Sequence, residues 1–191
     1  MRTLIFEGIA SSGKTTIEQN LVKFFASQRI SCNLIDENTT LMPILDNKDR
    51  QTSIKFLNDV LDKVYKNPAQ IIIFDRLYFT HIITTNSTLE NFKSIENRLL
   101  QYNPTIIFLK VDEHKIPERI LWAMEHRDEK WLVHVKKKGT NEQIFEYYKN
   151  QQRKIEELTK QTALPLMVMA TSDLDFDKVS QKIFNDIVTL G

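Results

Sequence analysis

Two glycines, a lysine and two threonines stand close together near the start of the chain, in Gly8-Ile9-Ala10-Ser11-Ser12-Gly13-Lys14-Thr15-Thr16. The spacing fits G-x-x-x-x-G-K-[ST], with an apolar strand pattern before it and an amphipathic helix pattern after it. Glycines let the backbone curl so that successive N–H groups point inward, and a helix start adds partial positive charge. We therefore expect residues 8–16 to bind a phosphate chain, with Lys14 on the β- and γ-phosphates and the Thr15 hydroxyl on Mg²⁺.

A second pair of charged residues, Asp75-Arg76, follows the apolar run Ile71 to Phe74. The carboxyl ends of parallel strands are where ligands bind in open α/β sheets. A GTPase switch would place D-x-x-G here, and no glycine stands at the required position. The sequence thus predicts Asp75 beside the Mg²⁺ ion and Arg76 on a phosphate oxygen.

Short β-rich runs alternate with stretches whose apolar residues recur three and four positions apart. Strands that are apolar on both faces and separated by helices indicate a parallel sheet covered on both sides. Helix starts are expected at two capping boxes, Ser87 with Glu90 and Thr140 with Gln143, and at Pro117. The prediction is a single α/β domain over residues 1–191, doubly wound around a five-stranded parallel sheet with strands at Thr3–Glu7, Cys32–Asp36, Gln70–Asp75, Thr105–Val111 and Leu166–Ala170.

Net charge, cysteine content and the length of apolar runs indicate which kinds of partner to expect. A net charge of +1 over 191 residues provides no field that would attract nucleic acid or acidic membranes. Cys32 is the only cysteine, which suits a reducing compartment, and the longest apolar runs are far shorter than a membrane span. We expect a cytoplasmic protein that acts on a small molecule and binds neither nucleic acid nor membrane; a homodimer is left open.

Four motifs together resemble the thymidylate kinase family and, more loosely, the deoxynucleoside kinases: "FEGIASSGKTT", "IIIFDRLYF", the arginines Arg119 and Arg127, and "PLMVMATSD". The resemblance implies a P-loop kinase with sheet order 2-3-1-4-5, ATP and Mg²⁺ as cofactors, and an arginine-bearing lid over about residues 119–139. In that family pattern Arg119 and Arg127 close over the transferring phosphoryl group. The nucleotide base would lie against Thr171, Ser172 and Asp173.

The identity of the phosphoryl acceptor depends on the loop Asp36-Glu37-Asn38-Thr39-Thr40. Thymidylate kinases typically carry an arginine after the second strand and an acid in the P-loop at the position of Ala10, whereas this chain has no arginine before Arg50. Deoxynucleoside kinases place a glutamate there as a base toward the sugar hydroxyl, and Glu37 matches that position. A monophosphate attacks through an ionised oxygen and needs only cations, but a hydroxyl benefits from a carboxylate.

Three functions are therefore compatible with the sequence. The whole-chain resemblance and Arg76 favour phosphoryl transfer from ATP to a nucleoside monophosphate. The alternative is transfer to a nucleoside or another small hydroxyl compound, with Glu37 as the base. A non-catalytic ATP-binding module that switches a partner is the remaining class, although such a module has no need of the distal arginines.

Overall fold

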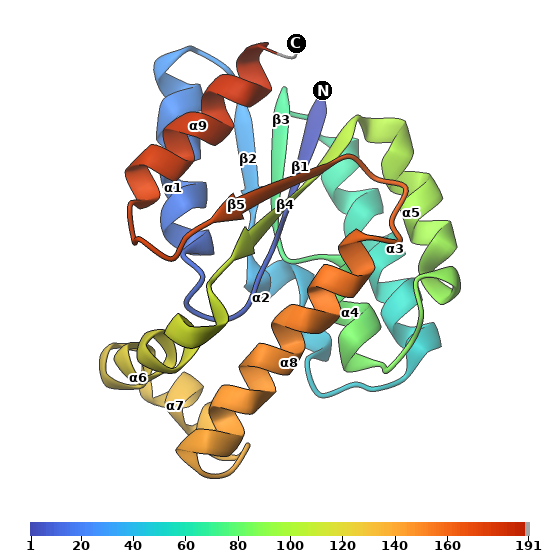
Figure 1. Cartoon of the computed structure of the whole chain (residues 1–191). Helices are drawn as coiled ribbons and strands as arrows, with labels where there is room; N and C mark the ends of the chain where they lie inside the picture. Colours follow the sequence, from blue (N-terminus) through green and yellow to red (C-terminus); the bar gives the residue numbers. More distant parts are fainter. Residues whose placement is uncertain (190–191) are drawn as a thin grey trace.

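One five-stranded sheet organises the computed structural model, which describes residues 1–189 (Figure 1). All the pairings are parallel and the order is β2-β3-β1-β4-β5. The doubly wound sheet and its strand order are thus confirmed. The strands are β1 (Arg2–Glu7), β2 (Cys32–Ile35), β3 (Ile71–Asp75), β4 (Pro104–Lys110) and β5 (Leu166–Ala170).

The central strand β1 links the two halves of the sheet. Phe6 pairs with Asp75 of β3 on one side and with Ile107 of β4 on the other. Because all five strands run in one direction, the loops that follow them meet along one edge, at the bottom of Figure 1. This carboxyl edge is where the sequence places its charged motifs.

Helices cover both faces of the sheet. On one face α1 (Lys14–Ser27) and α9 (Phe176–Thr189) pack together over Leu4 and Phe6 of β1. On the other face Ile5 joins a core with α3 (Arg50–Lys66), α4 (Tyr78–Thr84), α5 (Lys93–Leu99) and α8 (Asn141–Thr159). Alternate residues of β1 are buried in opposite layers, which explains the apolar run Leu4-Ile5-Phe6.

The remaining helices lie at the carboxyl edge. They are α2 (Glu37–Thr40), α6 (Ile116–His126) and α7 (Glu129–Lys136). Single 3₁₀ turns occur elsewhere along the chain, at Met42–Ile44, Glu90–Phe92, Leu100–Tyr102 and Glu113–Lys115. Pro117 lies in the first turn of α6, as expected. In Figure 1, α6 and α7 project beyond the sheet next to α8.

Helix caps account for most of the boundaries. The capping box of Thr140 and Gln143 starts α8 as predicted, and Asp49 caps α3 by accepting from the Thr52 N–H at 2.7 Å. The box predicted at Ser87 and Glu90 is wrong. Thr88 instead bonds Asn91 Oδ1 through its backbone and hydroxyl, so a 3₁₀ turn precedes α5.

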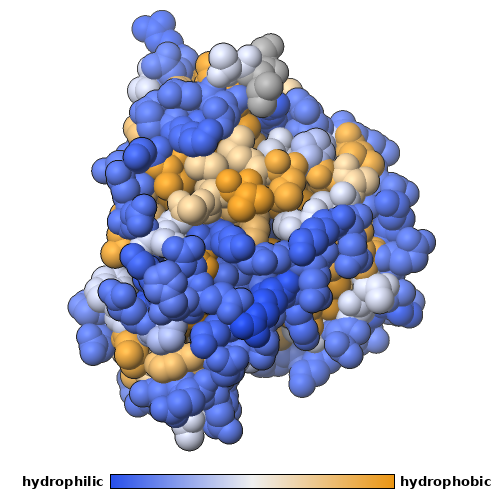
Figure 2. All heavy atoms as spheres, in the orientation of Figure 1, coloured by the Kyte–Doolittle hydropathy of each residue, from blue (hydrophilic) through white to orange (hydrophobic). Residues whose placement is uncertain are grey.

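Strand β5 forms one outer edge of the sheet and is only partly covered. Leu166 is 39% exposed and Val168 51% exposed. Figure 2 shows apolar surface gathered along this strand, between the more hydrophilic helices. Within residues 1–189, no helix combines the length and the apolar character needed to cross a bilayer.

Candidate active site

The loop between β1 and α1 is tightly constrained. A side chain at Gly8 would bring its Cβ to 2.9 Å from the Leu109 carbonyl oxygen. Gly13 has a φ of +92°, and a Cβ there would overlap the ring of Phe176. Within the loop, Ser11 also has a positive φ, and Ala10 is buried. Only glycine suits positions 8 and 13, as a loop that curls around phosphate oxygens requires.

Lys14 is held inside this loop. Its side chain is 6% exposed, and Nζ donates to the Gly8 and Ile9 carbonyl oxygens at 3.2 and 3.1 Å. Burial and the nearby Arg76 charge lower the pKa of Lys14, against the opposite effect of Asp75 and Glu37. Ser12 Oγ is buried without a hydrogen-bond partner in the described chain. A bound phosphate would supply acceptors for both side chains.

Asp75 and Arg76 are both buried where β3 ends. The Arg76 backbone N–H donates to the Phe6 carbonyl at 3.0 Å, and its φ is +60°. Burial raises the pKa of Asp75, although the Lys14 and Arg76 charges oppose this shift. Asp75 Oδ1, Arg76 Nε and Arg76 Nη1 have no hydrogen-bond partner among the described residues. Buried polar atoms of both residues are therefore available to a ligand.

Glu37 faces Arg76 from the loop after β2. It opens α2, which Asp36 caps by accepting from the Thr39 N–H at 3.1 Å. Arg76 Nε lies 3.4 Å from Glu37 Oε2. Burial alone would raise the pKa of Glu37, but the Arg76 and Lys14 charges outweigh it and hold the pKa below its usual range. The structure thus brings an ionised carboxylate next to the predicted phosphate contacts.

The two distal arginines occupy different surroundings. Arg119 is buried, donates to the Ser11 carbonyl at 3.4 Å and to the Thr171 carbonyl, and stacks on Phe176 at 5.6 Å. Arg127 is exposed at the end of α6, with its guanidinium 4.8 Å from the Trp131 ring. Arg119 therefore belongs to the wall of the P-loop, whereas Arg127 lies on the surface against Trp131.

The loop after β5 also reaches the P-loop. Thr171 and Ser172 are buried, with the Thr171 N–H donating to the Lys110 carbonyl and Ser172 Oγ accepting from the Asp112 N–H at 2.8 Å. Asp173 is exposed. Arg119 and Phe176 connect this loop to Ser11 and Gly13. The residues expected beside a nucleotide base thus adjoin the expected phosphate loop.

Sequence reasoning missed two buried carboxyls near the loop. Glu7 ends β1 and is fully buried; burial raises its pKa to about 7, although Arg76 opposes the shift. Glu18 lies one helical turn after Lys14, and burial together with Asp75 raises its pKa to about 8. The available signals were an acid directly after the apolar run Leu4-Ile5-Phe6 and an acid on the buried face of a helix.

A buried histidine forms part of the same region. His81 Nε2 lies 2.9 Å from the Thr40 carbonyl oxygen, and its ring stacks on Phe56 at 6.0 Å. Burial lowers the pKa of His81 to about 4, against the Thr40 hydrogen bond. Thr40 in turn donates through its hydroxyl to the Asp75 carbonyl at 2.8 Å. His81 therefore contacts Thr40, the last residue of α2, as a neutral ring.

The donor atoms near the P-loop suit Mg²⁺. The Thr15 hydroxyl is exposed at the start of α1, and Asp75 Oδ1 lacks a hydrogen-bond partner in the described chain. No three His, Cys, Asp or Glu side chains converge into a metal cage within residues 1–189. Mg²⁺ usually takes one or two protein oxygens and completes its shell with substrate phosphates and water. The two oxygens fit that manner of binding.

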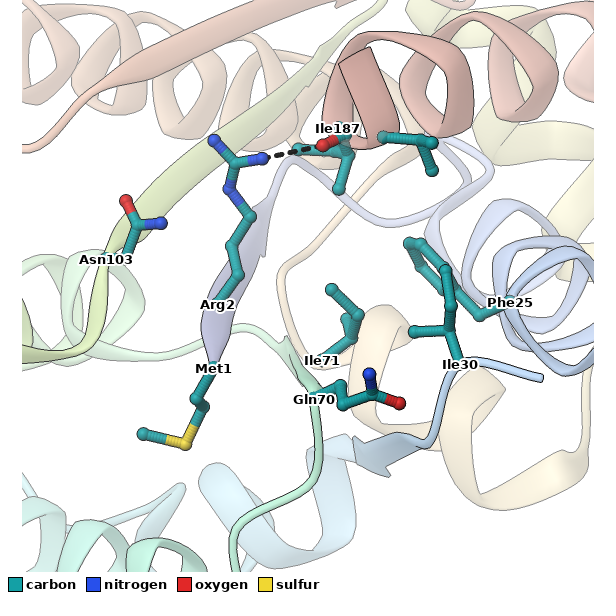
Figure 3. A pocket seen from close by; sticks show the side chains of 9 residues that line it. Met1, Arg2, Phe25, Ile30, Gln70, Ile71, Asn103 and Ile187 are labelled. Atoms are coloured by element: carbon teal, nitrogen blue, oxygen red, sulfur yellow. Dashed lines mark hydrogen bonds between the residues drawn. The ribbon is translucent and has the colours of Figure 1, made fainter. Parts of the chain in front are cut away.

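A hollow of about 300 Å³ opens at the opposite, amino end of the strands (Figure 3). Met1, Phe25 and Ile30 are among its lining residues, and Arg2 donates to the Ile187 carbonyl at 2.7 Å across its mouth. Ligands of open parallel sheets bind at the carboxyl ends of the strands. The hollow is thus separate from the charged cluster of Lys14, Glu37, Asp75 and Arg76.

No protein-family model matches the sequence, and no protein of curated function matches it in sequence. Solved structures do match in fold. A YorR protein from Bacillus subtilis in complex with phosphorylated GDP has a TM-score of 0.65 at 16% identity, covering 97% of this chain and 95% of its own. The chain has the P-loop kinase fold.

Two further structures illustrate the range of this fold. A deoxyadenosine kinase from M. mycoides with bound dCTP has a TM-score of 0.56 at 21% identity, covering 99% of this chain and 100% of its own. A shikimate kinase from Bacteroides thetaiotaomicron has a TM-score of 0.60 at 12% identity, covering 97% of each chain. At these identities the likeness establishes the fold alone.

Proposed function

We propose that this protein transfers a phosphoryl group from ATP, with Mg²⁺, to a hydroxyl of a nucleoside-like small molecule. The observation that carries the proposal is the 3.4 Å pair between Arg76 Nε and Glu37 Oε2 beside the P-loop. A monophosphate-binding arginine should present its charge to the ligand, but here a carboxylate already compensates it. The pair therefore favours the hydroxyl acceptor over the monophosphate that the whole-chain resemblance favoured.

The donor half of the mechanism follows from the P-loop. Lys14, now bonded to the Gly8 and Ile9 carbonyls, would turn its ammonium to the β- and γ-phosphates. Thr15 and Asp75 would hold Mg²⁺, which neutralises charge on the phosphates. Arg119 and the loop from Thr171 to Asp173 would form one side of the site for the nucleotide base. Arg127, on a lid over about residues 119–139, would approach the phosphoryl group in the closed state.

The acceptor half depends on Glu37. Its carboxylate takes the hydroxyl proton as the new P–O bond forms and the bond to the ADP oxygen breaks. The Arg76 charge, 3.4 Å away, lowers the pKa of Glu37 and so favours its ionised form. Deoxyadenosine and shikimate, which name two structural neighbours, are both hydroxyl compounds without a phosphate. A nucleotide-binding switch would not need a base so close to its P-loop.

One observation favours a nucleoside monophosphate as the second candidate. Arg76 Nη1 is buried without a hydrogen-bond partner in the described chain, so an acceptor phosphate could take it as a donor.

Cytoplasmic location and homodimer formation remain predictions, as does a single kinase domain spanning residues 1–191.

Paired substitutions distinguish the two acceptors. In a screen of deoxynucleosides and their 5′-monophosphates with ATP and Mg²⁺, we expect turnover of a deoxynucleoside. Glu37→Gln keeps the shape but removes the base, so kcat should fall by roughly 10²–10⁴-fold. Turnover confined to monophosphates, with Glu37→Gln nearly unaffected and Arg76→Ala raising the acceptor KM, would instead establish the second candidate.

A further inference from the structure

The last residue of β1 lies between the two halves of the site. Glu7 directly precedes Gly8 of the P-loop and is 0% exposed. Its carboxylate contacts the turn between β3 and α4: Oε1 accepts from the Leu77 N–H at 3.2 Å, and Oε2 accepts from the Thr80 hydroxyl at 3.2 Å. One side chain thus links the start of the phosphate loop to the turn that carries Arg76.

That turn has an unfavourable backbone. Arg76 has a φ of +60°, and Leu77 has φ −149° and ψ −119°. A residue held in such regions costs about 1–3 kcal/mol and keeps its geometry only where its surroundings impose it. Here two consecutive residues of β1 bind the backbone N–H groups of two consecutive turn residues, Phe6 with Arg76 and Glu7 with Leu77.

A carboxylate meets the requirements of this position. Leu77 is buried and its N–H needs an acceptor, and the three residues of β1 before Glu7 have apolar side chains. The second carboxylate oxygen binds Thr80, which fixes the first turn of α4. The charges of Arg76 and Lys14 also act on Glu7. Glu7 has no exposed surface, and both of its carboxylate oxygens are occupied by Leu77 and Thr80, so the side chain acts through these neighbours.

We propose that Glu7 is a positioning residue that fixes the Arg76 turn relative to the P-loop, and thereby aligns the acceptor with the donor phosphate. The inference rests on the proposed function for its kinetic consequence. A displacement of about 1 Å at a reacting centre can cost ~10²-fold in rate. The effect should fall on the acceptor, because the turn holds Arg76 and, through it, Glu37.

Three variants test the contacts, and a fourth provides a matched control. Glu7→Ala removes both contacts. Glu7→Gln keeps them, since the amide oxygen accepts from Leu77 and the Thr80 hydroxyl accepts from the amide. Thr80→Val removes one contact at constant shape. Glu96→Gln alters another fully buried carboxyl, which pairs with Lys93 and accepts from the Ala163 N–H at 3.0 Å, the Thr162 hydroxyl at 2.6 Å and the Tyr78 hydroxyl at 3.4 Å. None of these contacts is to the P-loop or to the Leu77 N–H, and the amide oxygen of Gln can still accept.

Kinetics use ATP and the best acceptor from the screen of deoxynucleosides and monophosphates. We expect Glu7→Ala to lower the acceptor kcat/KM by ~10²-fold, to leave the ATP KM within about twofold, and to be largely rescued by Glu7→Gln. Thr80→Val should fall between them, and Glu96→Gln should leave both constants unchanged. Wild-type kinetics in Glu7→Ala, equal losses for both substrates, or a failure of Glu7→Gln to rescue would overturn the proposal.

Hydrogen exchange at the Leu77 amide tests the same contact without turnover. Protection should be lost in Glu7→Ala and kept in Glu7→Gln and Glu96→Gln, even if the wild type phosphorylates none of the acceptors. An inactive wild type with this exchange pattern would refute the proposed function but not the positioning role. If Glu7→Ala does not fold, Thr80→Val decides: an unchanged acceptor kcat/KM overturns the inference.

Discussion

The proposed donor and acceptor sides of the site differ in what their charged side chains contact. On the donor side, charged side chains contact backbone carbonyls: Lys14 binds those of Gly8 and Ile9, and Arg119 binds those of Ser11 and Thr171. On the acceptor side, charged side chains face each other, as Glu37 and Arg76 do. A backbone cradle suits a constant phosphate chain, whereas a side-chain pair can change with the acceptor by substitution.

Removing the donor-side cation should have the largest effect. Lys14→Ala leaves the helix start intact but removes the charge nearest the bond between the β- and γ-phosphates, so phosphoryl transfer should be abolished. Coupled measurement of ADP release, with circular dichroism to verify folding, checks this. A variant with wild-type turnover would show that residues 8–16 do not form the nucleotide site.

The two distal arginines should separate kinetically. Arg127→Ala should lower kcat by ~10³-fold with little change in ATP affinity, because an exposed lid arginine meets the phosphoryl group only in the closed state. Arg119→Ala should mainly weaken ATP binding, by about tenfold or more, since its hydrogen bonds hold the donor wall. Titration with ATP alongside steady-state kinetics measures both. Identical profiles for the two variants would contradict the division of roles.

A moderate effect on stability should come from the donor loop. Gly13→Ala adds a Cβ against Phe176 at a positive φ, which should destabilise the fold by about 2–3 kcal/mol. Combining it with Phe176→Leu should recover the steric part, so the two changes should be non-additive in urea unfolding. Strict additivity would mean that the backbone conformation alone explains the requirement for glycine.

An effect confined to acidic pH concerns the support of the acceptor loop. His81 has a pKa of about 4 in the folded protein and 6.5 as its ordinary value, so between these values the unfolded chain binds more protons. Stability should therefore fall as pH drops from 6.5 to 4, by up to ~3 kcal/mol from this residue. Relative to His81→Gln, the wild type should lose stability only in this interval; parallel curves would disprove the assignment.

Sequence patterns identified the donor side more fully than the acceptor side. The P-loop is a local motif because its backbone demands glycines at fixed spacing, and alternating apolar runs indicated the sheet. The pairing of Glu37 with Arg76 joins residues from separate loops, so it appears only once β2 and β3 lie side by side. The same holds for Glu7 and Leu77, and for the burial of Arg119 against the P-loop.

The central position of β1 has a consequence for synthesis on the ribosome. This strand is made before both of its partners, β3 and β4, and its side chains are buried between two helical layers. At ~5–20 residues per second, β4 follows β1 by roughly 5–20 s. Until then the apolar side chains of β1 and the loop after it stay exposed, so the proposed nucleotide site cannot form before residues 104–110 have emerged.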